Sequence, residues 1–340
     1  MNSSIQSNYT ISLDAMSGDN GPDVVVRAAK FSLDNHPNLR VIFVGKEDVL
    51  SSLVIKIIGF DERVSIHDAS EVISMSESPA EAVRKKKNSS MRVAIDKVKD
   101  GSANACVSAG NTGALMAIAK FVLKMLPGIN RPAIMAELPA SGGTVHMLDL
   151  GANTVNDSEQ LFQFALMGSI VAGDICDLEN PRVSLLNIGV EDMKGNDNVK
   201  NAANLLSQSG LNYIGFIEGN EIFSGKTDVV VTDGFTGNVA LKTIEGTASY
   251  VISSLRNAFS KNIFTKLQAL LSRPVLTKLS EAMDSRKYNG ASLVGLNGIV
   301  IKSHGSADAY SFHCAIETAV IEVKNQVPDQ IRKLLEQESG

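Results

Sequence analysis

Short apolar runs alternate with segments that carry apolar residues at helical spacing along most of the chain. Most of the runs end in glycine, asparagine or aspartate and lead into such a segment. Because continuous apolar strands are typical of a sheet covered on both faces, the pattern predicts a three-layer α/β/α fold with a largely parallel sheet. The runs of strand length are 9–15, 39–44, 64–67, 105–108, 145–150, 183–187, 213–218, 229–233 and 299–301.

Two helical segments affect the expected organisation. Pro79 suits the first turn of a helix, and we expect a long helix from there to about residue 100. Residues 248–280 also have a helical pattern, which we expect Pro274 to interrupt. We therefore expect four regions: a flexible extension at 1–8, a single α/β catalytic domain at 9–325, a helical projection within it at 250–286, and a C-terminal helix or tail at 326–340.

Composition excludes several classes of protein. The chain has 340 residues, 44% of them hydrophobic and 20% charged, which is typical of a globular protein with a sizeable core. A net charge of -5 argues against nucleic acid as a partner. Three widely spaced cysteines without a CxxC pair predict neither a disulfide framework nor a zinc site, as in a reducing cytosol. No apolar run is long enough to span a bilayer, so we expect a cytoplasmic protein with at most peripheral membrane contact.

The basic helical region has two interpretations. Within 262–272 the apolar residues fall inside an arc of about 120° at helical spacing. That stripe could pack on the core or at a dimer interface, or it could contact a membrane surface or an acidic partner protein. A second basic run lies on the expected helix after Pro79, and it is either a solvated face or a docking site for an acidic carrier protein. The candidate contact residues are Arg84, Lys85, Lys86, Arg256, Lys261, Lys266 and Arg273.

Glycine, asparagine and aspartate recur where the expected strands end. In α/β sheets, ligands bind outside the carboxyl ends of strands. Glycine lets backbone N–H groups approach an anion, and asparagine donates without charge. Each turn alone is explained by ordinary turn and cap chemistry, but together they predict one pocket for phosphate or an oxyanion. The turns are 14–19, 108–113, 149–154, 187–189 with 194–196, 233–238 and 302–306.

Two charged or titratable side chains in these turns are candidates for chemistry. Lys194 could hold phosphate as a point charge, or it could be a solvated surface lysine. His304 follows the apolar run 299–301 and could transfer protons or stabilise charge, although a cap or packing role is the alternative. Cys106 lies inside an apolar run and is expected to be buried and inert.

Familiar catalytic motifs are missing from the sequence. There is no GxSxG elbow, no GxGxxG after a strand and no HExxH. Residues 219–227 resemble a P-loop, but five residues separate the glycines where four are required. A serine hydrolase, a P-loop nucleotide site and a zinc peptidase are therefore disfavoured.

The strings DAMSGDNGP, VSAGNTGALMA, MLDLGANT, LLNIGVEDMKGN, DGFTGNVALKTIEG and GLNGIVIKSHGSADA resemble the bacterial phosphate acyltransferase family. The match is collinear from about residue 11 to residue 323, although Ser17 and Gly21 replace the family's usual Gly and Ala. The resemblance implies conversion of acyl-[acyl carrier protein] and inorganic phosphate to acyl phosphate, an early step of phospholipid synthesis. It also implies a fold like isocitrate and isopropylmalate dehydrogenases, a homodimer peripheral to the membrane, and membrane or carrier contact near 250–286. From the missing motifs we expect no metal or cofactor.

In that reaction phosphate is itself the nucleophile, so no enzyme serine or cysteine is required. We expect Asn111 and Asn238 to donate to the oxyanion and phosphate, and Lys194 and His304 to hold charge or move protons. Two alternatives remain open: an NAD(P)-dependent dehydrogenase on a related fold, and a non-enzymatic scaffold for membrane and carrier protein. The further candidates for substrate or phosphate binding are Asp14, Gly18, Asp19, Ser108, Gly110, Thr112, Asn153, Asn187, Gly189, Asn196, Asp233, Gly234 and Gly237.

Overall fold

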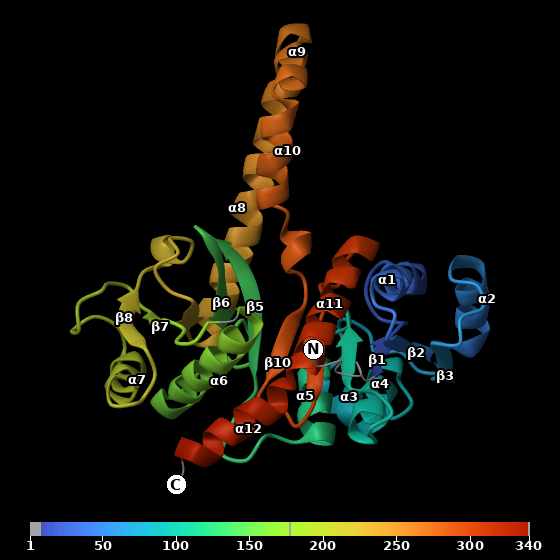
Figure 1. Cartoon of the computed structure of the whole chain (residues 1–340), viewed down its shortest axis with the longest axis horizontal. Helices are drawn as coiled ribbons and strands as arrows, with labels where there is room; N and C mark the ends of the chain where they lie inside the picture. The colour runs from blue at the N-terminus through green and yellow to red at the C-terminus, as the bar shows by residue number, and fades with distance from the viewer. Residues whose placement is uncertain (1–7, 177, 339–340) are drawn as a thin grey trace, which may run out of the picture.

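A computed structural model describes residues 8–176 and 178–338, and its strands form a single sheet (Figure 1). Most of the expected flexible extension at 1–8 lies outside the described residues. The order across the eleven-stranded sheet is β3-β2-β1-β4-β11-β10-β5-β6-β9-β7-β8. The strands are β1 (Tyr9–Asp14), β2 (Leu39–Gly45), β3 (Val64–Asp68), β4 (Ala105–Ser108), β5 (Ala133–Ala140), β6 (Gly143–Leu148), β7 (Val183–Leu186), β8 (Tyr213–Ile217), β9 (Val229–Val231), β10 (Ala291–Val294) and β11 (Ile299–Lys302).

The sheet has two parallel halves that run in opposite directions. Strands β1, β2, β3, β4 and β11 are parallel to one another, and so are β6, β7, β8 and β9. Between them, β10 pairs antiparallel with both β11 and β5, and β5 pairs antiparallel with β6. The carboxyl ends of the two halves therefore lie at opposite edges of the sheet. The largely parallel sheet is confirmed, whereas β5 and β10 were not among the expected strands.

Helices cover both faces of the sheet and complete the three layers. Strand residues alternate between two apolar clusters, so that Ile11 and Leu13 pack with α1 and α11 while Cys106 and Val300 pack with α4 and α5. A third cluster joins α6 and α7 to the second half. The helices are α1 (Gly21–Asn35), α2 (Glu47–Ile57), α3 (Pro79–Lys85), α4 (Ser90–Lys99), α5 (Thr112–Leu123), α6 (Ser158–Cys176), α7 (Asp197–Ser207), α8 (Gly234–Ser260), α9 (Ile263–Leu271), α10 (Arg273–Ala282), α11 (Ala309–Asn325) and α12 (Val327–Glu338), with short 3₁₀ turns at Gly219–Glu221 and Ser285–Tyr288.

The long helix expected after Pro79 is wrong, because the segment folds as two helices. The first ends at Lys85, and Ser89 then adopts an extended conformation at the N-cap of α4. Its hydroxyl accepts a hydrogen bond from the backbone N–H of Arg92 at 3.3 Å. Serine competes with the helical backbone in this way, so the pair Ser89–Ser90 starts a new helix instead of continuing the old one.

The helices α8, α9 and α10 form a projection that stands away from the body of the molecule (Figure 1). Helix α8 ends at Ser260. Asn262 then caps α9, accepting hydrogen bonds from Phe264 N and Thr265 N at 3.0 Å. The expected interruption near Pro274 is confirmed: α9 ends at Leu271, and Pro274 lies in the first turn of the next helix, α10. No helix in residues 8–176 and 178–338 is long and apolar enough to cross a membrane.

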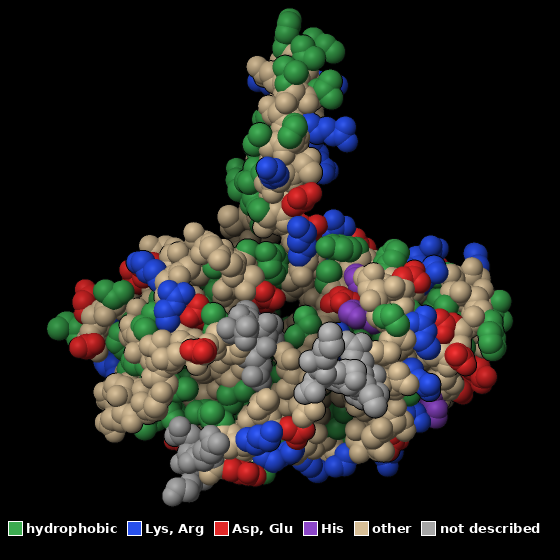
Figure 2. All heavy atoms as spheres, in the orientation of Figure 1, with side chains coloured by type: hydrophobic (Ala, Val, Ile, Leu, Met, Phe, Trp, Pro, Cys, Tyr) green, Lys and Arg blue, Asp and Glu red, His purple; other side chains and the backbone are tan. Residues whose placement is uncertain are grey.

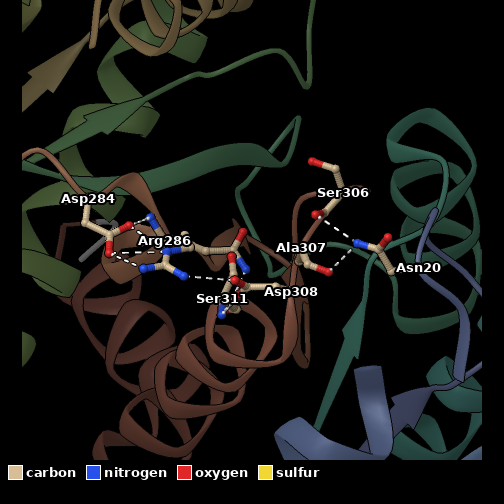
Figure 3. A network of polar contacts seen from close by, with 8 residues as sticks. Asn20, Asp284, Arg286, Ser306, Ala307, Asp308 and Ser311 are labelled. Atoms are coloured by element: carbon tan, nitrogen blue, oxygen red, sulfur yellow. Dashed lines mark hydrogen bonds and ion pairs between the residues drawn. The ribbon is translucent and has the colours of Figure 1, made fainter. Parts of the chain in front are cut away.

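The base of the projection is fixed to the first half of the sheet. Arg286 donates to Asp284 at 2.8 Å and to Asp308, the N-cap of α11, at 2.9 Å (Figure 3). Because α11 begins where the turn after β11 ends, the projection leaves the body at the edge that holds the carboxyl ends of β1, β4 and β11.

Candidate active site at the carboxyl ends of β1, β4 and β11

Three polar side chains form a row across adjacent strands of the first half. Ser108 pairs with Lys302 between β4 and β11, and Asp14 follows the last β1–β4 pair, Leu13 with Val107. Since neighbouring strand residues point to opposite faces, and Leu13, Val107 and Ile301 face α1 and α11, the row faces α4 and α5. Polar groups therefore replace the apolar pattern at one position on three strands, all at their carboxyl ends.

Asp14 is a fully buried member of the row, as is Ser108. Its Oδ2 accepts from the Ser108 hydroxyl at 2.6 Å and from the Ser17 hydroxyl, while Oδ1 has no partner among the described residues. Burial raises the pKa of Asp14, and the serine hydroxyls oppose that change.

Lys302 is the cation of the row, and the sequence analysis did not single it out. Its Nζ donates to the backbone carbonyl of Ala109 at 3.4 Å and to that of Ser303. Burial lowers the pKa of Lys302 to about 8, with a further decrease from the positive charge of Lys242. The sequence did contain a signal for this residue, because a lysine follows directly on the apolar run 299–301, at a position where the alternation predicts an apolar residue.

The turns 14–19 and 302–306 come together beside this row, as their composition suggested. Gly18 has φ +94°, and a Cβ there would lie 3.2 Å from the carbonyl oxygen of Gly305. The N–H of Asp19 donates to the same carbonyl at 2.8 Å. Asn20 then donates to the carbonyls of Ser306 and Ala307 at 3.1 and 3.0 Å (Figure 3). Glycine at position 18 is needed for this close approach.

Residue His304 lies exposed at the rim of the row. Its backbone N–H donates to Asn289 Oδ1 at 2.9 Å, and its Nδ1 lies 2.8 Å from the Ser306 hydroxyl. This arrangement fixes the ring's direction and holds an imidazole two residues beyond Lys302, in the turn after β11. His304 is the one sequence candidate for proton transfer that lies at this edge of the sheet.

The turn after β4 is hydrogen-bonded to the 75–77 loop and to the start of α5. Asn111 caps α5, accepting from Ala114 N at 3.0 Å, and its amide donates to the carbonyls of Met75 at 2.9 Å and Glu77 at 3.0 Å. Gly110 N donates to the Ser108 hydroxyl at 3.1 Å, and Thr112 begins α5. The amide that was expected to face an oxyanion therefore binds the 75–77 loop.

The other strand-end turns lie at the opposite edge, so the single pocket that the sequence predicted is not formed within the chain. Asp149 accepts four backbone N–H groups, among them Ala152 N and Asn153 N at 2.8 Å. Asn153 also donates to the carbonyl of Pro132 at 2.8 Å. Gly234 and Gly237 lie against the carbonyls of Asn153 and Asp149, where no Cβ would fit. These residues pack two turns together.

The remaining candidates of this second edge are caps and turn residues. Asn196 caps α7 and accepts from Val199 N at 2.9 Å; Asp233 caps α8 and accepts from Thr236 N at 2.9 Å. Asn187 donates to the carbonyl of Lys194 at 3.2 Å, closing an exposed turn. Gly189 lies against the side chain of Lys194, and Asn238 lies against Gly151 in the first turn of α8.

A cavity of about 320 Å³ opens at the second edge, but its lining suits an anion poorly. It contains the Asp233 carboxylate together with Asn156, Asn196 and Phe235, and no lysine or arginine of the described chain lines it. A carboxylate without a cation repels phosphate. The first edge, with Lys302 in the row, is therefore the better candidate site.

Comparisons with known proteins place this chain in a family. The chain matches the family model described as "Fatty acid synthesis protein" over residues 9–330. It is 56% identical to a phosphate acyltransferase of Alkalilimnicola ehrlichii, over 96% of each chain. The chain belongs to the phosphate acyltransferase family. A second member of the family, from Methylococcus capsulatus, is 54% identical over 95% of each chain. As a phosphate acyltransferase family member, the chain is an enzyme of lipid synthesis.

Solved structures confirm the predicted fold class. A phosphotransacetylase from Streptococcus pyogenes has a TM-score of 0.64 and 18% identity, and covers 95% of this chain and 94% of its own. A 4-hydroxythreonine-4-phosphate dehydrogenase from Klebsiella pneumoniae has a TM-score of 0.52 and 14% identity, and covers 92% of this chain and 99% of its own. At such identities the likeness establishes the fold alone, which transferases and dehydrogenases share.

Proposed function

We propose that the chain transfers the acyl group of an acyl carrier protein thioester to inorganic phosphate, giving acyl phosphate and the free carrier thiol. A phosphate oxygen attacks the thioester carbonyl carbon, a C–O bond forms, the C–S bond breaks, and the thiolate takes a proton. The observation that carries the proposal is the row Asp14, Ser108 and Lys302, a buried polar site with a cation at three strand ends. Family membership supplies the reaction class.

This reaction needs no covalent nucleophile from the enzyme, and the cysteine on β4 is unsuited to that role. Cys106 is fully buried on β4, and burial raises its thiol pKa far above the ordinary value. A buried thiol of that kind is inert, as the sequence predicted. In the proposal, Lys302 stabilises negative charge and His304 manages protons at the rim.

Carrier protein is proposed to dock beside the row through the basic residues of α3. This helix packs against α5, and a Cβ on Gly113 would lie 2.9 Å from the Pro79 ring. The loop before it is held by Asn111 at the turn after β4. Arg84, Lys85 and Lys86 are therefore near the site edge. Reversing Arg84 and Lys86 to glutamate is expected to raise KM for an acidic acyl carrier protein while leaving KM for phosphate unchanged.

The tip of the projection is proposed to contact a membrane surface. Ile263, Phe264 and Leu271 are about three-quarters exposed, at 74%, 76% and 76%. Figure 2 shows hydrophobic side chains gathered at the tip with lysine and arginine side chains beside them. Exposed apolar groups beside cations are typical of interfacial helices. The basic residues available in this region are Arg256, Lys261, Lys266 and Arg273.

A homodimer is proposed to use the exposed apolar face of α8. Phe235, Val239 and Tyr250 are 64%, 51% and 72% exposed and lie within about 60° on the helix. Sedimentation of the wild type and of a Phe235→Lys, Val239→Lys variant distinguishes the states. Loss of dimer in the variant supports the proposal, and a monomeric wild type contradicts it.

The reaction itself is tested by incubating the enzyme with acyl carrier protein thioester, with and without phosphate. Phosphate-dependent release of free carrier thiol, together with an acyl product that hydroxylamine traps, is the expected result. Thiol release at the same rate without phosphate would overturn the proposal.

A further inference from the structure

The segment that leads back from the projection to the sheet passes close to the turn after β11. The 3₁₀ turn Ser285–Tyr288 is followed by Asn289 and Gly290, and β10 begins at the next residue. Gly290 has φ +123°, and a Cβ there would lie 2.9 Å from the Cα of Ala315 on α11. Glycine therefore lets this segment pack directly against the helix that follows the turn 302–306.

The side chain of Asn289 is hydrogen-bonded to that turn at both ends of its amide group. Its Oδ1 accepts from the backbone N–H of His304 at 2.9 Å. Its Nδ2 donates to the Ser303 hydroxyl at 2.8 Å and to the carbonyl of Ser311, in the first turn of α11, at 2.7 Å. The acceptor and the donors of the amide thus all bind residues that come after β11.

The other side of the turn is held by a different part of the chain. The N–H of Asp19 donates to the carbonyl of Gly305 at 2.8 Å, and Asn20 donates to that of Ser306 at 3.1 Å (Figure 3). His304 is exposed, and its Nδ1 lies 2.8 Å from the hydroxyl of Ser306, which belongs to the same turn. The direction of the imidazole therefore depends on how firmly the backbone of the turn is fixed from both sides.

We propose that Asn289 is a positioning residue, which fixes the backbone at His304 and so holds the imidazole at the rim of the row during acyl transfer. This inference rests on the proposed function, in which His304 moves protons. A displacement of about 1 Å in a reacting group can lower a rate by about 10²-fold, so a hydrogen bond to the backbone of such a group affects the rate without touching substrate.

The test is a double-mutant cycle between Asn289 and His304, with kcat and both KM values measured by phosphate-dependent thiol release. N289A is expected to lower kcat by about 10-fold and to change each KM by less than about 2-fold. In the H304A background the same substitution should lower kcat by less than about 2-fold, because no imidazole remains to be positioned. An equal loss of kcat in both backgrounds would overturn the proposal.

A matched control separates positioning from a general loosening of the segment. R286Q removes the neighbouring hydrogen bond to Asp308 but leaves Asn289 and its partners in place. We expect R286Q to lower the melting temperature and to leave kcat unchanged. A loss of kcat in R286Q equal to that in N289A would also overturn the proposal. If N289A does not fold, N289D replaces it in the cycle, since it keeps an oxygen that can accept from the His304 N–H.

The cycle also distinguishes failure of this inference from failure of the proposed function. If the wild type releases no thiol in a phosphate-dependent manner, the proposed function fails, and the NMR signals of the His304 imidazole then decide the role of Asn289. Signals that shift in N289A but not in R286Q would support positioning by Asn289. Signals that are unchanged in a folded N289A would overturn it.

Discussion

The hydroxyl of Ser108 donates to Oδ2 of Asp14 over 2.6 Å, joining the ends of two neighbouring parallel strands. Both side chains are fully buried, so this hydrogen bond has no competition from bulk water. Ser108→Ala removes the donor and leaves the carboxylate with less compensation. We expect the free energy of unfolding to fall by about 1–3 kcal/mol at pH 7, measured in urea. Unchanged stability would mean that the bond contributes nothing.

Lys302 should make stability depend on pH in the alkaline range. Its pKa is about 8 in the fold and 10.5 ordinarily, so between these values the unfolded chain binds more protons. Stability attributable to this group therefore rises as pH increases from about 8 to about 10. Lys302→Met removes the unfavourable burial of charge and should stabilise the protein by about 1–2 kcal/mol at pH 7. The figure is smaller than the full pKa shift implies, because solvent screens the charge at this partly exposed site.

The difference in free energy of unfolding between Lys302→Met and the wild type should decrease as the pH approaches 10, because the wild-type lysine is then neutral in the fold. Thermal melts of both proteins from pH 7 to pH 10 provide the measurement. A constant difference across that range would show that the substitution acts through packing and not through charge.

Glu322 should produce the opposite pH dependence. It lies buried on α11 at the edge of a small cavity that Ser292 and Val327 also line, and Oε1 has no partner among the described residues. Burial raises its pKa to about 7, with the Ser292 hydroxyl opposing, so the folded state binds more protons than the unfolded one between about pH 4.5 and 7. Stability from this group falls as pH rises through that window.

The neutral variant Glu322→Gln should therefore be more stable than the wild type at pH 8, by up to about 3 kcal/mol. At pH 4.5 the two proteins should unfold at nearly the same urea concentration, since the wild-type carboxyl is then protonated in the fold. A variant that is less stable at pH 8 would contradict the burial of a charged carboxylate at this site.

His304 and Lys194 should differ in their effect on catalysis, because they lie at opposite edges of the sheet. His304→Ala is expected to lower kcat by about 10²-fold, as loss of a positioned proton-transfer group usually does. Lys194→Ala, in the exposed turn after β7, is expected to change kcat less than 3-fold. Phosphate-dependent thiol release measures both. The reverse ranking would move the active site to the second edge.

Sequence reasoning found the fold class because its signal is local and repeated. Apolar runs that end in glycine or asparagine predicted most strands of both halves, and the alternation with helices predicted the layers. It did not predict β10, a four-residue strand, or β5, which contains Pro139 and was not recognised as a strand. The antiparallel pairing of these two strands reverses the strand direction between the two halves of the sheet. Without them, the sequence could not show that the carboxyl ends of the two halves lie at opposite edges.

The site was harder to predict, because the same residue types serve turns and ligands. Asn111, Asn196 and Asp233 are helix caps in the structure, and that use was indistinguishable from anion binding in the sequence. Asp14 and Ser108 were singled out, and they do lie side by side. Lys302 was overlooked in favour of its neighbour His304, since only the strand register shows that it joins their row.

Helix α8 runs without a break from the body of the molecule into the projection. A single 27-residue helix carries Lys242 near its packed end and Ser260 near the tip, about 27 Å further along. Ala240, Leu241 and Ile244 pack against the body of the molecule, so this end of the helix is held in place. Because the helix is continuous, a rigid-body tilt of the tip would also move the packed segment that carries Lys242.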